Sequence, residues 1–197
     1  MLFLLDCVVD IKKLPLLLEN FNIAKPSSNN QRVYADMLEV SACAIACQLF
    51  PAEYRKARSV KSTEDFALES GNKTIYIDVK TRQLNADLNM PNMISVDKLN
   101  KLLDNPDTEL YYWMIDYRVK DDGSAVVEHN EIRAVWTLPW NALSIQNLGL
   151  GQLQISDWSA INDSSFPRDV WHIMLKERMR SFYSRQAEKF LQLAKKV

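Results

Sequence analysis

Glycine is scarce in this sequence, which has only four glycines among its 197 residues. Loops that bind nucleotide phosphates through backbone N–H groups need several glycines at fixed spacing, and α/β-hydrolases carry their nucleophile in a G-x-S-x-G turn. The sequence contains neither pattern. Its composition therefore argues against a nucleotide-binding loop and against a hydrolase of that class.

Histidine and cysteine are also rare, with two and three residues. His129 and His172 stand far from the cysteines and show no zinc-ligand spacing, and we expect His129 to lie in a loop. Cys43 and Cys47 are four residues apart in "SACAIACQLF", where a helix would bury them as small apolar groups. With Cys7, they are interpreted as reduced core residues of a cytoplasmic protein.

Neither sign of charge predominates, because the sequence has 24 basic and 25 acidic side chains and a net charge of -1. General attraction to nucleic acid is not indicated, although a local basic face remains possible. The apolar "MLFLLDCVV" is interrupted by Asp6 and is too short to span a membrane, so we expect a core strand or helix and no membrane partner. An apolar share of 47% fits a single domain over residues 1–197.

The order of periodic segments predicts the fold class. We expect a helix over residues 31–50, a hairpin of two strands within "DFALESGNKTIYIDVK", and a helix from Ser95 to just before Pro106. Two further strands, "ELYYWMIDYRV" and "EIRAVWTLPW", follow, and a long helix begins near Pro167. Residues 141–167 look irregular, with a possible short strand in "LGLGQLQIS". This order predicts a mixed α/β or α+β fold, in which α-helices flank a central mixed β-sheet.

The stretch "KTIYIDVKTRQ" places Asp78 and Lys80 on one face of a strand, because side chains alternate along a strand. The acid-any-Lys pattern is weak alone, and Asp10 and Lys12 repeat it. The copy formed by Asp78 and Lys80 differs because Asp65 opens the preceding strand, and the hairpin can bring Asp65 back towards this copy. The sequence therefore predicts that Asp65, Asp78 and Lys80 converge at one edge of the sheet.

Two carboxylates that meet in this way need a cation to remain ionised together, and Mg²⁺ prefers oxygen ligands of this kind. The backbone carbonyl of Val79 could add a third oxygen. Lys80 could orient a water, while the metal lowers the pKa of that water and stabilises charge on a phosphate. These parts suit the hydrolysis of a phosphodiester. The alternative is an ordinary ion pair between Asp78 and Lys80 on an exposed strand.

In these residues the chain resembles the PD-(D/E)xK nuclease superfamily, and within it a type II restriction endonuclease. The resemblance implies a restriction-endonuclease-like fold and a Mg²⁺ cofactor. It makes Asp65 the first acid, Asp78 the second and Lys80 the lysine, with Asp65, Asp78 and Val79 as metal ligands. It also makes Glu39, in "YADMLEVSACA", the catalytic glutamate that the preceding helix often supplies.

Some assignments remain open at this point. Glu64 stands before the first acid where the family has proline, and Glu69 could replace Asp65 as the upstream acid if the hairpin register differs. Glu39 lies on a helix that we expect to be mostly buried, where an acid needs a partner, so it has either a functional role or a structural salt bridge. Asp116 is interpreted as structural.

The function implied is that of a Mg²⁺-dependent, sequence-specific endodeoxyribonuclease acting on double-stranded DNA as a homodimer, in a host that carries a cognate DNA methyltransferase. A structure-selective repair or junction nuclease and a non-catalytic DNA-binding domain are the alternatives. The C-terminal helix has enough apolar side chains to serve as core or as a dimer contact. The candidate DNA-binding residues lie in a basic cluster, which otherwise forms a solvated loop, and after the catalytic lysine; they are Arg55, Lys56, Arg58, Lys61, Thr81, Arg82, Gln83 and Asn85.

Overall fold

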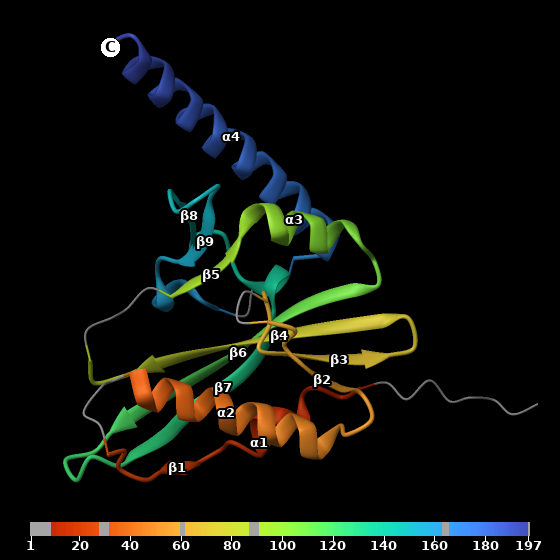
Figure 1. The fold of residues 1–197 in the computed structure, drawn as a ribbon, viewed down its shortest axis with the longest axis vertical. Helices are drawn as coiled ribbons and strands as arrows, with labels where there is room; N and C mark the ends of the chain where they lie inside the picture. The colour runs from red at the N-terminus through yellow and green to blue at the C-terminus, as the bar shows by residue number, and fades with distance from the viewer. Residues whose placement is uncertain (1–8, 28–31, 60–61, 87–90, 163–165, 197) are drawn as a thin grey trace, which may run out of the picture. The chain divides into compact units, whose positions relative to one another are not determined.

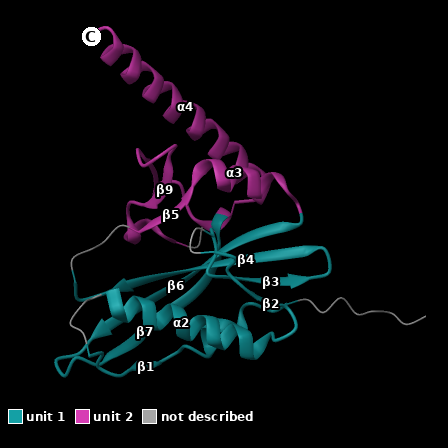
Figure 2. Ribbon diagram, viewed as in Figure 1, with its two compact units in different colours: residues 1–89, 107–135 teal, residues 90–106, 136–197 magenta. Residues whose placement is uncertain are grey.

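The computed structural model describes residues 9–27, 32–59, 62–86, 91–162 and 166–196 (Figure 1). They fall into two compact units, which are described separately (Figure 2). The first unit comprises residues 1–89 and 107–135, and the second comprises residues 90–106 and 136–197. A single domain over the whole chain stays a prediction.

The first unit is built on a six-stranded sheet. β4 and β6 run parallel, whereas the other neighbouring strands are antiparallel, so the sheet is mixed. The mixed sheet predicted from the sequence is confirmed. In their order across the sheet, the strands are β1 (Asn22–Ile23), β7 (Ala125–Ala134), β6 (Thr108–Val119), β4 (Lys73–Gln83), β3 (Phe66–Ser70) and β2 (Tyr54–Lys56).

The predicted hairpin is confirmed as β3 and β4, which are paired from Phe66 with Ile77 to Ser70 with Lys73. Gly71 in the connection has a φ of 59°, a left-handed conformation that glycine adopts without steric cost. The basic cluster is in part a strand and not wholly a loop, because β2 (Tyr54–Lys56) pairs with β3 at the edge of the sheet. The core therefore ends at a short edge strand rich in basic residues.

Helices α1 (Lys13–Leu16) and α2 (Arg32–Leu49) pack against one face of this sheet (Figure 1). The predicted helix over residues 31–50 is confirmed, and it ends just before Pro51. Its side chains meet the odd-numbered residues of β4 and β6, because alternate residues of a strand share a face. The main buried side chains of this layer are Leu14, Leu38, Ala42, Ile77, Val79, Trp113 and Ile115.

The sequence analysis is wrong on one cysteine. Cys43 is half-buried and packs against the core, but Cys47 is exposed on α2. Four residues of helix turn through slightly more than one full turn, so the second cysteine lies farther round the cylinder, away from the sheet. Cys7 lies outside the described residues.

The opposite face of the sheet carries polar and charged side chains. The strand register aligns even-numbered residues of β4 and β6 with residues of β7 in three rows across the sheet. The three rows are Asp78, Tyr112 and Arg133; Lys80, Met114 and Glu131; and Arg82, Asp116 and His129. His129 therefore lies in β7 and not in a loop, which corrects the prediction.

The second unit contains an antiparallel sheet of three short strands and two helices. Helix α3 begins where predicted, with the Ser95 hydroxyl accepting the Lys98 N–H at 3.3 Å. The strand predicted in "EIRAVWTLPW" ends earlier than expected, because Val135–Thr137 form a 3₁₀ turn. The elements are β5 (Asn92–Ser95), α3 (Val96–Asp104), β8 (Leu143–Gln146), β9 (Gln152–Ile155), a 3₁₀ turn at Trp158–Ala160 and α4 (Arg168–Ala194).

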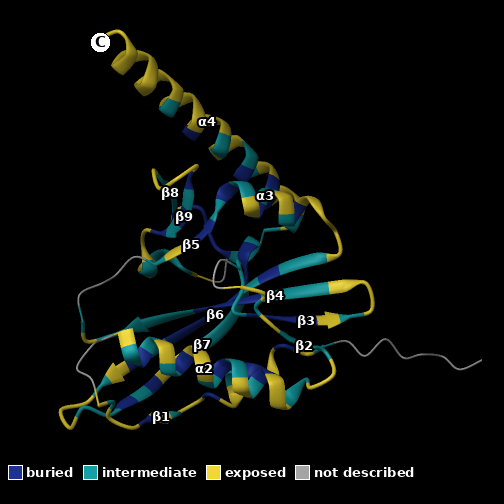
Figure 3. Ribbon diagram, viewed as in Figure 1, coloured by how far each residue is buried: buried dark blue, intermediate teal, exposed yellow. Residues whose placement is uncertain are grey.

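The first half of α4 belongs to the core of the second unit. Trp171 is buried, stacks on Trp140 with ring centroids 4.6 Å apart, and donates its indole N–H to the Leu138 carbonyl at 2.9 Å. Phe182 is also buried, whereas Phe190 is exposed. The part of α4 nearest the C-terminus is mostly exposed (Figure 3). Among the described helices, none is both long enough and apolar enough to cross a membrane.

Candidate active site

Asp65 is fixed just before the first residue of strand β3. Its backbone N–H donates to the Ile77 carbonyl at 2.9 Å, and its carboxylate accepts the Val79 N–H at 2.6 Å. The side chain thus satisfies a backbone donor of β4 at a point where β3 no longer provides a partner. The hairpin returns Asp65 to the segment that holds Asp78, as the sequence predicts.

Asp78 and Lys80 lie side by side on the polar face of β4. The Lys80 ammonium donates to Oδ1 of Asp78 at 2.8 Å, and the Asp78 side chain is only 7% exposed. Burial raises the pKa of Asp78 to about 7, and the nearby Asp65 carboxyl adds to this rise while Lys80 opposes it. The pair is therefore not an exposed ion pair, because a buried carboxylate is shared between an ammonium and a second carboxyl group.

Glu39 reaches this cluster from α2. Partial burial raises the pKa of Glu39, and the nearby Asp65 carboxyl adds to this rise. The residue stands at an exposed position of the helix, so the expectation of a mostly buried position is wrong. α2 presents its apolar side to the sheet, and Glu39 lies on the margin of that side, within reach of the strand edge. Glu39, Asp65, Asp78 and Lys80 thus come together.

The other two acids near Asp65 are engaged elsewhere. Glu69 is opposite Thr74, four residues before Asp78, and it accepts from Nε of Arg55 at 2.5 Å. Glu64 lies 3.5 Å from the same guanidinium. Asp65, rather than Glu69, is the acid that contacts the segment of β4 containing Asp78.

The donor set at this edge fits a divalent cation. The carboxyl of Asp65 lies near enough to Asp78 to raise the pKa of Asp78, and two neighbouring carboxylates repel each other unless a proton or a cation is shared between them. The N–H and C=O of one strand residue point to the same side, so the carbonyl of Val79 faces the side on which its N–H meets Asp65. Within the described ranges, no three His, Cys, Asp or Glu side chains are grouped so as to hold a metal. The fitting set is two carboxylates and one carbonyl.

The predicted DNA-binding residues in the basic cluster differ in their solvent exposure and in their ion pairs. Lys56 and Arg58 are exposed. Arg55 is held by its ion pairs with Glu64 and Glu69. Lys61 lies outside the described residues. The structure therefore leaves two cations of this cluster clearly accessible.

The predicted residues after Lys80 also have partners within the chain. Arg82 forms a two-pronged ion pair with Asp116, with its Nε 2.8 Å from Oδ1, which agrees with a structural role for Asp116. The Asn85 side chain bonds both backbone groups of Val119, at 2.8 and 3.2 Å, and continues the β4–β6 pairing. Thr81 and Gln83 are half-buried.

The sequence analysis did not single out Tyr112, which is fully buried and lies opposite Asp78 in the parallel pairing of β4 and β6. Within the part of the chain that the structure describes, its hydroxyl has no hydrogen-bond partner. The alternating pattern of "ELYYWMIDYRV" indicates a strand, but it does not indicate which residue of another strand Tyr112 faces.

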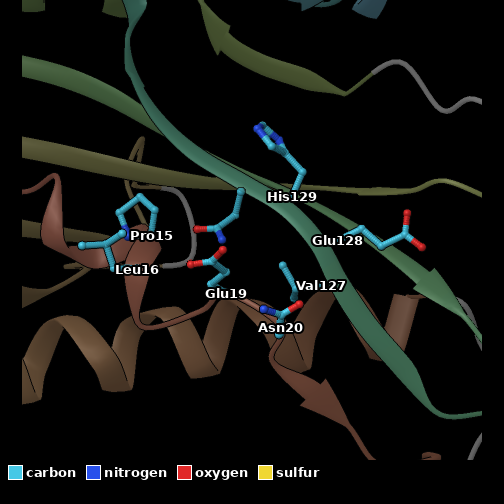
Figure 4. Close-up of a pocket in the computed structure, with 8 residues that line it drawn as sticks. Pro15, Leu16, Glu19, Asn20, Val127, Glu128 and His129 are labelled. Atoms are coloured by element: carbon cyan, nitrogen blue, oxygen red, sulfur yellow. The ribbon is translucent and has the colours of Figure 1, made fainter.

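A pocket of about 240 Å³ lies elsewhere on the first unit, between β7 and the segment that follows α1 (Figure 4). Glu19, Glu128 and His129 line it, and none of the predicted site residues does. Glu128 is bound by Arg118, with 2.5 Å between Oε1 and Nε. In Figure 4 the His129 ring points away from Glu19, so these groups do not form a converging site.

No protein-family model matches the sequence, and no curated protein matches it. Among solved structures, the chain is similar to the NlaIV restriction endonuclease. The two are 12% identical, the match covers 84% of this chain and 82% of that one, and the TM-score is 0.49. A likeness this distant carries no information on activity, and the function proposed below rests on the side chains of the chain itself.

Proposed function

We propose that the chain is a Mg²⁺-dependent endodeoxyribonuclease that hydrolyses phosphodiester bonds in double-stranded DNA at specific sequences, as type II restriction enzymes do. The observation that supports this most strongly is the placement of the Asp65 carboxylate, which accepts the Val79 N–H beside Asp78 at 2.6 Å, together with Lys80 bonded to Asp78 at 2.8 Å. The resemblance to PD-(D/E)xK nucleases was inferred from the same residues.

Each residue has a distinct role in this proposal. Asp65, Asp78 and the Val79 carbonyl hold the cation, which supplies Lewis-acid stabilisation of the phosphate and lowers the pKa of a water. Lys80, whose ammonium is anchored on Asp78 in the absence of a cation, orients the attacking water and stabilises the negative charge that develops. Glu39, whose carboxyl lies near that of Asp65, keeps Asp65 in position.

DNA binding in this proposal depends on local rather than net charge. Lys56 and Arg58 contact phosphates, together with Arg55 and Lys61 of the same cluster, and Thr81, Arg82, Gln83 and Asn85 lie after the catalytic lysine on the same strand edge. Two copies of the chain form a homodimer in the cytoplasm, which predicts a palindromic or near-palindromic target. A cognate DNA methyltransferase in the host protects its own sites.

The experiment that tests the proposal is cleavage of plasmid and phage DNA with Mg²⁺ and with EDTA. Discrete fragments that require Mg²⁺ are expected, and Asp78→Ala should abolish them without altering the fold. The matched control is Asp10→Ala. Asp10 belongs to the other acid-any-Lys pattern, is exposed, and has its Oδ2 3.9 Å from Nζ of Lys13. Asp10→Ala should cut like the unaltered chain.

Other outcomes would favour the alternative functions. Cleavage of branched substrates without cleavage of linear duplex would replace the restriction activity with a structure-selective one. DNA binding of equal strength with and without Mg²⁺, without cleavage under any metal, would indicate a non-catalytic DNA-binding domain. Loss of cutting in Asp10→Ala as well as in Asp78→Ala would contradict the assignment of the site to this hairpin.

A further inference from the structure

Tyr112 carries an unexplained buried polar group. The residue is 0% exposed in the middle of β6, and among the described residues its hydroxyl has no hydrogen-bond partner. An unpaired buried donor costs about 1–3 kcal/mol, and such groups are few in native proteins. A phenylalanine would fill the same space without that cost, so the hydroxyl calls for a partner that the metal-free chain does not supply.

The position of Tyr112 indicates what that partner is. Tyr112 is directly opposite Asp78 in the parallel pairing of β4 and β6, so the two side chains project from the same face of the sheet. The charge of Asp78 also acts on Tyr112, since together with burial it raises the pKa of the phenol. On the other side, Arg133 of β7 is opposite Tyr112 but lies 2.7 Å from Glu131. Asp78 is therefore the neighbouring acceptor.

The state of Asp78 explains why the hydroxyl has no partner without a metal. Lys80 already occupies Oδ1 of Asp78 and holds the carboxylate in its metal-free position. An ionised carboxylate offers about four lone-pair sites. If a cation displaces Lys80 from Asp78, the carboxylate gains acceptor capacity on its side of the sheet, where Tyr112 stands.

We propose that Tyr112 is a positioning residue of the metal site, whose hydroxyl donates to Asp78, directly or through one buried water, when a divalent cation is bound. The inference rests on the proposed function, because it assumes that Asp78 is a metal ligand. Carboxylates that bind metals are themselves held by hydrogen bonds from outer groups, and removal of such a group costs about 10–100-fold in metal affinity or activity. Tyr112 acts through Asp78 and does not touch the substrate.

Tyr112→Phe tests the proposal, because it removes only the hydroxyl. The affinity for Mn²⁺ is measured from the loss of the free-ion paramagnetic resonance signal, and the melting temperature is measured without metal. Mn²⁺ affinity should fall about tenfold or more. The metal-free melting temperature should stay the same or rise, because an unpaired buried hydroxyl has been removed.

The neighbouring tyrosine provides a matched control. Tyr111 projects from the other face of β6, and its hydroxyl donates to Glu109 at 3.0 Å. Tyr111→Phe should lower the metal-free melting temperature slightly and leave Mn²⁺ affinity unchanged. Opposite signatures for two adjacent tyrosines would support a specific role for Tyr112.

Asp78→Asn separates failure of this inference from failure of the proposed function. If Asp78→Asn loses Mn²⁺ and Tyr112→Phe binds it as tightly as the unaltered chain, only the role of Tyr112 is overturned. If Asp78→Asn binds Mn²⁺ normally, the metal site itself is overturned, and the role of Tyr112 with it. A marked fall in the metal-free melting temperature of Tyr112→Phe would show a structural hydroxyl and would also overturn the inference.

Discussion

The carboxylate of Asp65 accepts the backbone N–H of Val79 at 2.6 Å. This single bond joins the residue just before β3 to the middle of β4. It places an acid beside Asp78, whose own carboxyl is almost wholly buried. Two acids are thus held together by the backbone before any metal binds. An arrangement that costs electrostatic energy in the free protein is expected to be relieved by a cation.

The stability of the metal-free protein should fall as the pH rises from about 4 to about 7. The pKa of Asp78 is raised from its ordinary value of 3.8 to about 7 in the folded chain. Between these two values the folded chain keeps a proton that the unfolded chain has lost, so the free energy of unfolding decreases with pH. Each pKa unit of the difference corresponds to about 1.4 kcal/mol.

Urea denaturation in EDTA at several pH values from 4 to 8 measures this slope. Asp78→Asn should flatten the curve, because an amide does not titrate. Asp10→Asn removes an exposed carboxylate and should leave the slope as it is. An unaltered slope in Asp78→Asn would mean that another group is responsible.

Mg²⁺ binding should strengthen as the pH rises to about 7 and level off above it. The cation needs the ionised form of Asp78, so binding below the pKa of about 7 must displace a proton. For one displaced proton the affinity falls about tenfold per pH unit below that value. Titration calorimetry at pH 6 in two buffers with different ionisation enthalpies should show the release of close to one proton. Equal apparent enthalpies in both buffers would contradict it.

Glu39→Gln should reduce cleavage without unfolding the chain. Gln can still hydrogen-bond to Asp65, but it cannot supply the negative charge that acts on that carboxyl. Cleavage should drop about 10–100-fold, as for other groups that orient metal ligands, and the melting temperature should change little because the position is exposed. Asp36→Asn is the control, since Asp36 is an exposed acid of the same helix paired with Arg32 at 3.6 Å. Equal effects of the two substitutions would argue against a role for Glu39.

The sequence was sufficient to predict the hairpin and the meeting of its acids. Alternating residues and a Gly-containing turn fix the pairing of β3 with β4 locally, and Asp65 follows from that pairing. The pairing of β4 with β6 is different, because these strands are joined through a helix and their register depends on tertiary packing. Tyr112 was missed for this reason, although its strand was expected.

Short strands and the burial of individual helix side chains were also difficult to predict from the sequence. β2 has three residues and β8 has four, which is too few for a pattern of period two to be recognised. The short strand expected in "LGLGQLQIS" is confirmed as β9. The exposure of Cys47 depends on how α2 is rotated against the sheet, and small residues on several sides of that helix leave its rotation undetermined by sequence.

The ion pair between Arg82 and Asp116 should contribute more to stability than a similar pair on the surface. Its side chains are 24% and 13% exposed, whereas those of Arg118 and Glu128 are 47% and 36% exposed. Removing one partner of a poorly solvated pair leaves charge in a medium that screens it weakly, whereas exposed pairs contribute about 0–1 kcal/mol. Asp116→Ala should therefore lower the free energy of unfolding by about 2 kcal/mol or more, and Glu128→Ala by less than about 1 kcal/mol.

Double-mutant cycles for both pairs, measured by urea denaturation at low and high salt, separate the pair interaction from the loss of each side chain. A coupling energy for Arg82 and Asp116 no larger than that for Arg118 and Glu128 would show that the buried pair has no special weight in the fold.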